Sequence, residues 1–363
     1  MLKKSYIAML LLLMAGLVGC SKGEDPVPPV PEGEELSISF GAKSADEKSA
    51  ASASASAGRA DLVEGSNSAL FRSKPFSVYA DWIMPDANQT RVEVFRDQQV
   101  SYEASSNTPA GWTYDPLKAW EYAGNYDFRA YWPATVKTMG TASARNLAIE
   151  YSTLTNDEDL MVAYTHCATR NEGRPVELRF RHTLAAVAVK FRTQQAGMTC
   201  RVKNFFFTGL NYIGALSYYD TDPSADLTSR WIFSEGARAT VHETDILLSQ
   251  RLREWSDPAG RELTTSADDY PEEYALFPPQ SLVVTGAVPK PSITFTVDIL
   301  WNDTDTVTTT VALPDTNAEG EEMIWRAGKK YIYLITVEAD RFEIEVKTSD
   351  WDEVKSVTGD IHI

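Results

Sequence analysis

The sequence has few of the side chains that build metal sites or disulfide frameworks. Its 363 residues include three cysteines and four histidines, and the histidines are scattered without metal-ligand spacing, at His166, His182, His242 and His362. Only Cys167 and Cys200 follow Cys20. Two cysteines in a chain of this length do not make a disulfide framework; they could pair, but we interpret them as two separate buried thiols. The sequence therefore predicts no metal and no cofactor.

Catalytic motifs are also missing. The sequence contains no GxSxG nucleophile elbow, no HExxH zinc motif and no phosphate-binding loop. Carboxylates are plentiful, but nothing singles out a pair for glycoside hydrolysis. The spacing of Asp220, Asp222 and Asp226 hints at calcium, yet the glycine and bidentate glutamate of an EF-hand loop are absent, so we expect a solvated turn. His182 lies on the apolar face of an alternating segment and is predicted to be a hydrogen-bonded core residue. We therefore predict that the protein is not an enzyme.

Positive charge is scarce relative to negative charge. The chain has 34 lysines and arginines against 51 aspartates and glutamates, which gives a net charge of −17. This balance argues against nucleic-acid binding, which requires basic stripes, and against electrostatic docking on anionic membranes. It fits an extracellular protein that its charge keeps soluble.

The N-terminal hydrophobic run is too short to span a membrane comfortably. Two lysines precede an apolar stretch over residues 6–18, whereas a span needs about 20 residues. A basic start, a short apolar core and a small-residue cleavage site are typical of a secretory signal. The run LVGC that ends at Cys20 resembles a bacterial lipobox, in which the cysteine thiol is acylated; the alternative is an ordinary signal peptide with a chance cysteine. We expect residues 1–20 to be a lipoprotein signal peptide and Cys20 to carry the lipid.

The segment that follows, residues 21–59, contains one isolated strand signal. Residues 21–35 are acidic and rich in proline, which is typical of a semi-rigid tether. The alternation in residues 36–40 (LSISF) predicts a short strand. Residues 41–58 are almost wholly alanine, serine and glycine with a few charges, so a flexible loop is expected there, ending at Arg59-Ala60.

From about residue 70 the pattern is that of β-strands almost throughout. Residues 176–184 alternate apolar and charged side chains, and the parity then flips at Ala185-Ala186, which predicts a kink or bulge in the chain. Many short strands separated by turn residues are typical of sandwiches or barrels. A compositional gap near residues 193–197 is the best candidate for a domain boundary, which divides the chain into 60–195 and 196–363.

Several segments, taken in this order, resemble the fimbrillin family of lipoprotein pilins from anaerobic Gram-negative bacteria. The matching pieces span most of the chain after the signal peptide. They are the lipobox at Cys20, the strand LSISF at 36–40, Arg59-Ala60, FSVYA at 76–80, DLMVA at 159–163, VELRFRHTLAAVAVKF at 176–191, FPPQ at 277–280, WRAGKKY at 325–331, the strand at 342–346 and Trp351.

The resemblance implies an all-β fold of two transthyretin-like β-sandwich domains in tandem. It also implies export as a lipidated precursor to the outer membrane, removal of the N-terminal segment by an Arg-specific extracellular protease, and filling of the resulting groove by a strand from another subunit. The partners would be other pilin subunits, the protease, membrane lipid in the precursor and a host or glycan receptor.

These expectations assign roles to particular residues. The preferred cleavage site is Arg59-Ala60, with Arg72-Ser73 as the second choice because it sits closer to a structured strand. The leading strand that would be displaced carries Leu36, Ile38 and Phe40. The C-terminal donor candidates are Val357, Ile361 and Ile363; the alternative, given equal weight, is a strand that completes its own domain.

The sequence thus predicts a stalk or tip subunit of a surface pilus that takes part in adhesion and polymerises by donor-strand exchange. An anchor subunit, which would keep its lipid and not be cut, is a further option. The alternative is a non-polymerising surface lipoprotein that binds glycans, because it would share the lipobox, the acidic tether and the β-sandwich class.

Overall fold

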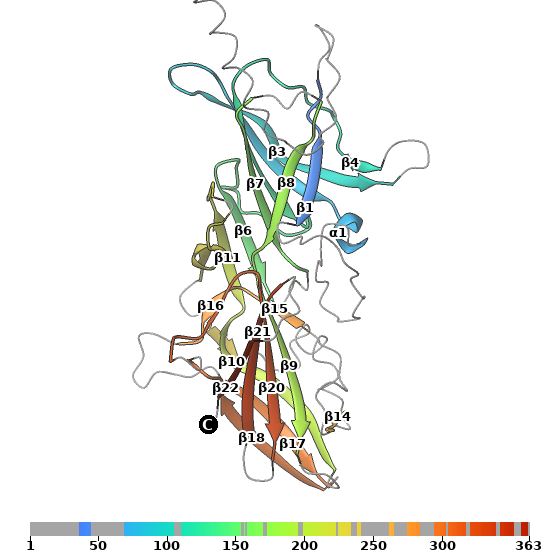
Figure 1. Ribbon diagram of the computed structural model, residues 1–363, viewed down its shortest axis with the longest axis vertical. Helices are drawn as coiled ribbons and strands as arrows, with labels where there is room; N and C mark the ends of the chain where they lie inside the picture. Colours follow the sequence, from blue (N-terminus) through green and yellow to red (C-terminus); the bar gives the residue numbers. More distant parts are fainter. Residues whose placement is uncertain are drawn as a thin grey trace, which may run out of the picture.

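A computed structural model of the chain is nearly all β-structure and elongated, with a barrel at one end and two five-stranded sheets at the other (Figure 1). It describes residues 36–44, 69–104, 110–153, 156, 158–169, 173–194, 199–222, 224–233, 238–240, 261–264, 274–283, 294–302, 304–316, 320–338, 342–351 and 357–361. No helix within these ranges is long and apolar enough to cross a membrane. The all-β class predicted from the alternating patterns is confirmed.

The N-terminal end is a closed barrel whose seven strands follow the order β1-β4-β3-β2-β5-β7-β8. A single short helix, α1 (Ala69–Ser73), precedes β2. The barrel strands are β1 (Phe40–Ser44), β2 (Phe76–Ile83), β3 (Arg91–Glu103), β4 (Gly111–Thr113), β5 (Asn125–Trp132), β7 (Met161–Cys167) and β8 (Val176–His182). All neighbouring pairs are antiparallel except β1 and β8, which run parallel.

The barrel interior is filled mainly by aromatic and branched side chains. The strand β8 illustrates how the interior is filled: its apolar side chains are all buried, while the glutamate and arginines between them face outward. This follows because successive side chains of a strand point to opposite faces. Phe76, Phe128 and Phe180 are fully buried and come from three different strands. Such rings bury large apolar areas, so they dominate the stability of the barrel.

The kink predicted at Ala185-Ala186 separates two sheets. β8 ends at His182 in the barrel, a bend follows at Leu184, and β9 (Ala185–Thr193) enters a different sheet. There β9 pairs in parallel with β20 (Lys329–Val337) and antiparallel with β15 (Tyr274–Phe277). The flip of parity is therefore the place where the chain leaves one core and enters another.

The C-terminal end consists of two sheets that face each other across a second core. The first contains β15, β9 and β20, followed by β21 (Phe342–Asp350) and β22 (Val357–Ile361). The second is built from β13 (Arg238–Thr240), β10 (Cys200–Asn211), β17 (Thr294–Trp301), β18 (Asp305–Ala312) and β14 (Arg261–Glu262). A short pair, β16 (Gln280–Ser281) and β19 (Ile324–Trp325), completes this end.

A third small sheet connects the two ends of the molecule. It joins β6 (Leu147–Ser152) to β11 (Ile213–Tyr218) and β12 (Trp231–Ile232), with the 3-10 helix η1 (Leu227–Arg230) beside it. A separate apolar cluster joins residues of this sheet to residues of the barrel and of β9 and β15 in the C-terminal sheet. The pairings of β6 with β11 and of β9 with β20 both join residues from before and after the domain boundary predicted at 195/196. That boundary stays a prediction.

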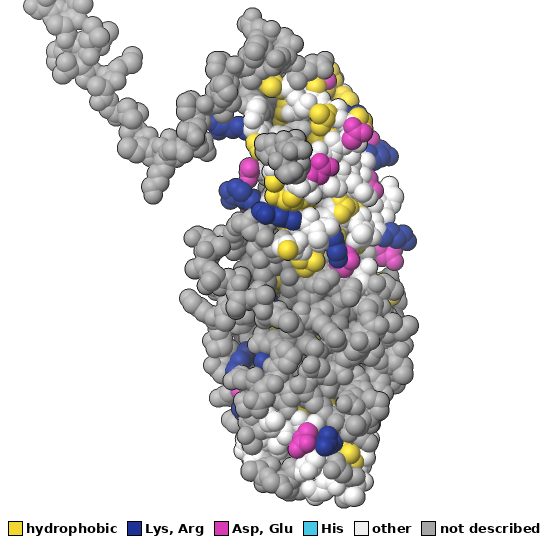
Figure 2. Space-filling view, turned by 90° about the vertical axis from the view of Figure 1, so that its right-hand side faces the viewer, with side chains coloured by type: hydrophobic (Ala, Val, Ile, Leu, Met, Phe, Trp, Pro, Cys, Tyr) yellow, Lys and Arg dark blue, Asp and Glu magenta, His cyan; other side chains and the backbone are white. Residues whose placement is uncertain are grey.

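Acidic and basic side chains are interspersed over the described part of the barrel on the face drawn in Figure 2. Among the described residues, no group of three or more His, Cys, Asp or Glu side chains could hold a metal ion.

Candidate functional site

The strand β1 closes the barrel although it lies near the start of the chain. Its residues Phe40–Ser44 pair in parallel with Val176–Phe180 of β8, and Phe40 also pairs with Trp112 of β4. Without β1 the strands β4 and β8 have no partner for these edges in the barrel order. Loss of this strand would therefore open the barrel between β4 and β8.

The residues just before β1 are held by backbone hydrogen bonds to a loop. The amide of Ile38 donates to the carbonyl of Lys118 at 2.8 Å, and the amide of Trp120 donates to the carbonyl of Leu36 at 2.8 Å. The Tyr114 hydroxyl donates to the Ile38 carbonyl at 2.8 Å. These bonds satisfy backbone groups that would otherwise be costly to bury.

The three apolar residues predicted for the leading strand all contact the barrel core. Ile38 and Phe40 are 1% and 4% exposed, and Leu36 is partly buried against the same cluster. Ser37 and Ser39 between them are exposed. The alternation in the sequence thus places one face in the barrel, as a strand requires. Their displacement stays a proposal.

The regular strand is shifted along the sequence from the predicted range. The ladder covers Phe40–Ser44, while Leu36 and Ile38 bond to the 118–120 loop and the Ser39 carbonyl accepts from Val176 at the start of β8. Residues 41–44 were expected to begin a loop, and that expectation is wrong. Gly41 and Ala42 can continue the strand because pairing with β8 uses the backbone, and Gly41 leaves space for Glu177, whose Oε1 atom would lie 2.6 Å from a Cβ at position 41.

The cleavage candidates lie in different settings. Arg59-Ala60, like Cys20, is outside the described residues. Arg72-Ser73 forms the end of α1, next to the fully buried Phe71. The Arg72 guanidinium lies 4.8 Å from the centre of the Tyr102 ring, a cation–π arrangement.

The C-terminal donor candidates lie at the edge of a sheet. β22 contains Val357 and Ile361 and, among the described strands, pairs only with β21, in the register Ile344↔Ile361 to Thr348↔Val357. Ile363 lies outside the described residues. An edge strand breaks fewer ladder bonds on leaving than a central one, because only one of its sides is paired.

The sequence patterns did not indicate the loop residues that pack around β1 and the residues just before it. Tyr114 and Trp120 are both buried and belong to a segment without strand alternation. Tyr114 packs on Phe40 with ring centres 5.5 Å apart, and Trp120 packs on Tyr126 at 4.7 Å. Only the density of aromatics around Pro116 could have indicated a buried loop there.

His182 is a hydrogen-bonded core residue, as predicted. Its Nδ1 atom lies 2.7 Å from Oδ2 of Asp159, and both side chains are completely buried. The imidazole stacks on the indole of Trp351, with ring centres 4.4 Å apart and planes 13° apart. The amide of Trp351 donates to the carbonyl of Gly328, and the amide of Gly328 donates to the carbonyl of Leu184. Four of the segments that carried the family resemblance therefore meet at one point, where the barrel joins the C-terminal sheets.

Gln280 is the last residue of FPPQ (277–280), another segment that resembles the family. Its side chain accepts a hydrogen bond from the Asn211 amide at 2.8 Å and donates to the Asn211 carbonyl at 3.1 Å. Gln280 is 4% exposed. A buried amide that pairs in both directions with one backbone residue aligns β16 beside the end of β10.

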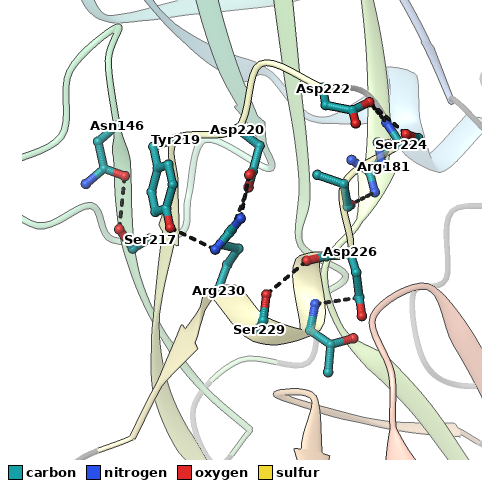
Figure 3. A network of polar contacts seen from close by, with 12 residues as sticks. Asn146, Arg181, Ser217, Tyr219, Asp220, Asp222, Ser224, Asp226, Ser229 and Arg230 are labelled. Atoms are coloured by element: carbon teal, nitrogen blue, oxygen red, sulfur yellow. Dashed lines mark hydrogen bonds and ion pairs between the residues drawn. The ribbon is translucent and has the colours of Figure 1, made fainter.

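The aspartates with calcium-like spacing each bond to a different protein group (Figure 3). Asp220 forms a two-pronged ion pair with Arg230, with contacts of 2.7 and 2.8 Å. Asp222 accepts from the amide and hydroxyl of Ser224. Asp226 accepts from the Thr228 amide at the start of η1. The three carboxylates thus stabilise the connection between β11 and β12.

A polar cluster on the outer face of the barrel is centred on Asp127. Its carboxylate contacts Arg91 at 2.7 Å, the Tyr164 hydroxyl at 2.8 Å and Nδ1 of His166 at 2.8 Å. Burial alone would raise the pKa of Asp127, but the hydrogen bonds from His166, Tyr164 and Arg91 outweigh it and lower the pKa from its usual value.

The two thiols are separate, which confirms their interpretation from the sequence. Cys167 is buried in the barrel core and Cys200 in the C-terminal core. Burial raises the pKa of Cys167 to about 11 and that of Cys200 to about 12. Thiolates react and bind metals, whereas these groups stay protonated at neutral pH.

Comparison with known proteins decides the family. A model of the fimbrillin-like family matches residues 66–351, which is most of the chain. The protein is a member of the fimbrillin-like family. Membership indicates a subunit of a cell-surface fimbrium and a structural role. No curated protein matches the sequence.

Solved structures with a related arrangement include two fimbrial proteins. A fimbrial protein from Bacteroides vulgatus is 14% identical with a TM-score of 0.46, and the match covers 76% of this chain and 92% of the other. The tip fimbrial protein Mfa3 from Porphyromonas gingivalis, with a C-terminal truncation, is 10% identical with a TM-score of 0.39, covering 77% and 96%.

Proposed function

We propose that this fimbrillin-like protein is a pilus subunit that is exported as a lipoprotein, anchored through Cys20, cut by an Arg-specific protease and polymerised by donor-strand exchange. The observation that carries the proposal is the position of β1. A strand close to the N-terminus closes the barrel, and a long Ala/Ser-rich stretch separates it from the rest of the barrel sequence.

Removal of β1 would leave a site that favours another strand. Two rows of backbone groups on β4 and β8 would lose partners, and the places of Ile38 and Phe40 would open to water. Burying these two side chains is worth roughly 1.5–3 kcal/mol each, before any ladder hydrogen bonds. An incoming strand with apolar residues at alternate positions would recover that free energy, which is the physical basis of β-augmentation.

The same contacts give β1 a protective role in the precursor. While Phe40 and Ile38 occupy the groove, a strand from another subunit cannot enter it. Cleavage after β1 breaks its covalent connection to the barrel, so that β1 can leave permanently. The leading segment would then carry the lipid on Cys20 away with it.

Arg59 is the better cleavage site of the two candidates. A protease binds its substrate in an extended form, and Arg72 lies in α1 beside the fully buried Phe71. Cleavage at Arg72 would require this turn to unfold. Arg59 follows a stretch of small residues with nothing to bury, which is the composition that proteases reach most easily.

The first experiment treats the lipidated precursor with an Arg-specific protease and determines the new N-terminus. We expect it at Ala60 and expect ladders of oligomers in unboiled gels after cleavage. Arg59→Ala should accumulate precursor, and Arg72→Ala is the matched control that should mature normally. A chain that is never cut near residue 60 and forms no ladder would contradict the proposal.

The second experiment concerns the donor. β22 at the sheet edge is the candidate, with Val357, Ile361 and the following Ile363 as its apolar residues. Deleting residues 356–363 should abolish ladder formation while leaving cleavage at Arg59 intact. Normal assembly of the deleted chain would show that β22 only completes its own sheet.

A further inference from the structure

A cleft lies at the end of the barrel that is opposite the junction with the C-terminal sheets. Ile83 pairs with Asn125 at this end, whereas the barrel meets the C-terminal sheets at the other end, near His182. The cleft has a volume of about 570 Å³, and its walls come from the β2–β3 connection, the loop before β5 and the residues after β7.

The walls are fixed by local hydrogen bonds. The indole of Trp82 donates to the Ala123 carbonyl at 2.7 Å. The loop before β5 crosses Trp82 closely at Gly124, which has φ +100° and has no space for a side chain, because a Cβ there would lie 2.5 Å from the indole nitrogen. On the other wall, both carboxylate oxygens of Asp86 accept hydrogen bonds from Thr90. The cleft is therefore formed before any ligand arrives.

The lining combines an aromatic ring with uncharged hydrogen-bonding groups and one carboxylate. Its members include Met84, Asp86, Gln89, Tyr122, Asn125 and Thr169. Tyr122 is 84% exposed, which is unusual for such a large side chain. The amide and hydroxyl groups can both donate and accept hydrogen bonds, whereas the ionised Asp86 carboxylate only accepts them.

The chemistry of this lining selects one class of ligand. None of the described lining residues is Lys, Arg or His, so phosphates and other anions meet no positive charge and are repelled by Asp86. A lipid would need a mainly apolar cavity. A pyranose ring has an apolar C–H face that suits a tyrosine ring, and a rim of hydroxyls that suits amides and carboxylates.

We propose that this cleft binds a neutral saccharide of two or three rings. A cavity of this size lies within the usual range for small-molecule sites, about 300–1,000 Å³. The site would give the subunit an adhesive function that is separate from assembly, because none of its lining residues belongs to β1 or β22.

The test is a binding assay with the chain from Ser21 and a defined panel of neutral oligosaccharides of two to four hexose, fucose or N-acetylhexosamine units, followed by titration calorimetry on those that bind. We expect at least one to bind, Tyr122→Ala to weaken it at least tenfold, and Gln89→Asn to weaken it severalfold. Asparagine tolerates the positive φ at position 89, so this variant shortens the side chain without straining the turn.

Leu117→Ala is the matched control, because Leu117 is 62% exposed on the same loop but does not line the cleft. It should bind like the wild type. The proposal is overturned if no neutral oligosaccharide binds, if Tyr122→Ala binds as well as the wild type, or if acidic glycans bind more tightly than neutral ones. Oligomer ladders measured on the same variants should not change.

Discussion

Phe40→Ala should release β1 from the barrel without unfolding the rest of the protein. The ring of Phe40 packs among Phe76, Phe95, Tyr114 and Phe128, with ring centres 5.5 to 6.1 Å away. Replacing a buried phenylalanine by alanine typically costs about 3–5 kcal/mol. Because about 1.4 kcal/mol corresponds to a factor of ten, the equilibrium between docked and undocked β1 should shift roughly 100- to 5,000-fold.

Hydrogen exchange measured by mass spectrometry can detect this shift in the uncut chain. Val176 at the start of β8 donates its amide to the Ser39 carbonyl, so peptides that cover β8 report directly on β1. Local opening exposes such amides at a rate set by the free energy of that opening alone. In Phe40→Ala, exchange should accelerate in residues 36–44 and 176–180, while β20 in the C-terminal sheet keeps its protection.

Ser39→Ala is the matched control, since Ser39 is exposed and its neighbours Ile38 and Phe40 are the buried ones. Two results would refute the reasoning. If Phe40→Ala exchanged like Ser39→Ala, Phe40 would not hold β1 in place. If exchange in β20 rose equally, β1 would not be a separate unit that could leave the barrel.

Three further predictions concern the polar cluster around Asp127, the two buried thiols and the contact between Trp351 and His182. Asp127→Asn should lower the free energy of unfolding by about 1–3 kcal/mol at pH 7. Because the pKa of Asp127 is lower in the folded than in the unfolded state, its contribution to stability is present above the unfolded pKa and is lost as pH falls through the folded pKa. Urea titrations of the variant and the wild type should therefore converge in acid. In a chain that begins after Cys20, neither Cys167 nor Cys200 should react with a maleimide at pH 7 while the protein is folded. After urea unfolds the protein, two equivalents of maleimide should react at once. Rapid labelling of the native chain would contradict the burial of the two thiols. Trp351→Ala should cost about 3–5 kcal/mol in urea unfolding, and Trp351→Phe, which keeps a ring on His182, distinctly less; equal losses would mean that stacking is unimportant there.

Local patterns predicted those features that depend only on nearby residues. The alternation of β8 and of residues 36–40 correctly indicated which side chains are buried, because a strand turns successive side chains to opposite faces whatever its partners are. The parity flip after residue 184 likewise marked a real change of direction. The ordered set of short motifs was enough to identify the family.

The sequence could not predict which strands pair with which. It gave no sign that β1 runs parallel to β8, that residues 41–44 extend the strand, or that Trp351 stacks on His182 from far along the chain. It also left the cleft beside Tyr122 undetected, because three separate connections form its walls.

The β-strand class, the family and the buried face of most strands could be read from the amino-acid sequence, because each depends on the identity and spacing of residues that are close together in the chain. The pairing of β1 with β4 and β8, by contrast, became visible only in the folded chain. Backbone groups carry no sequence identity, so any strand can pair with any edge, and the choice is made by the fit of side chains such as Phe40 into a core built from distant parts of the chain.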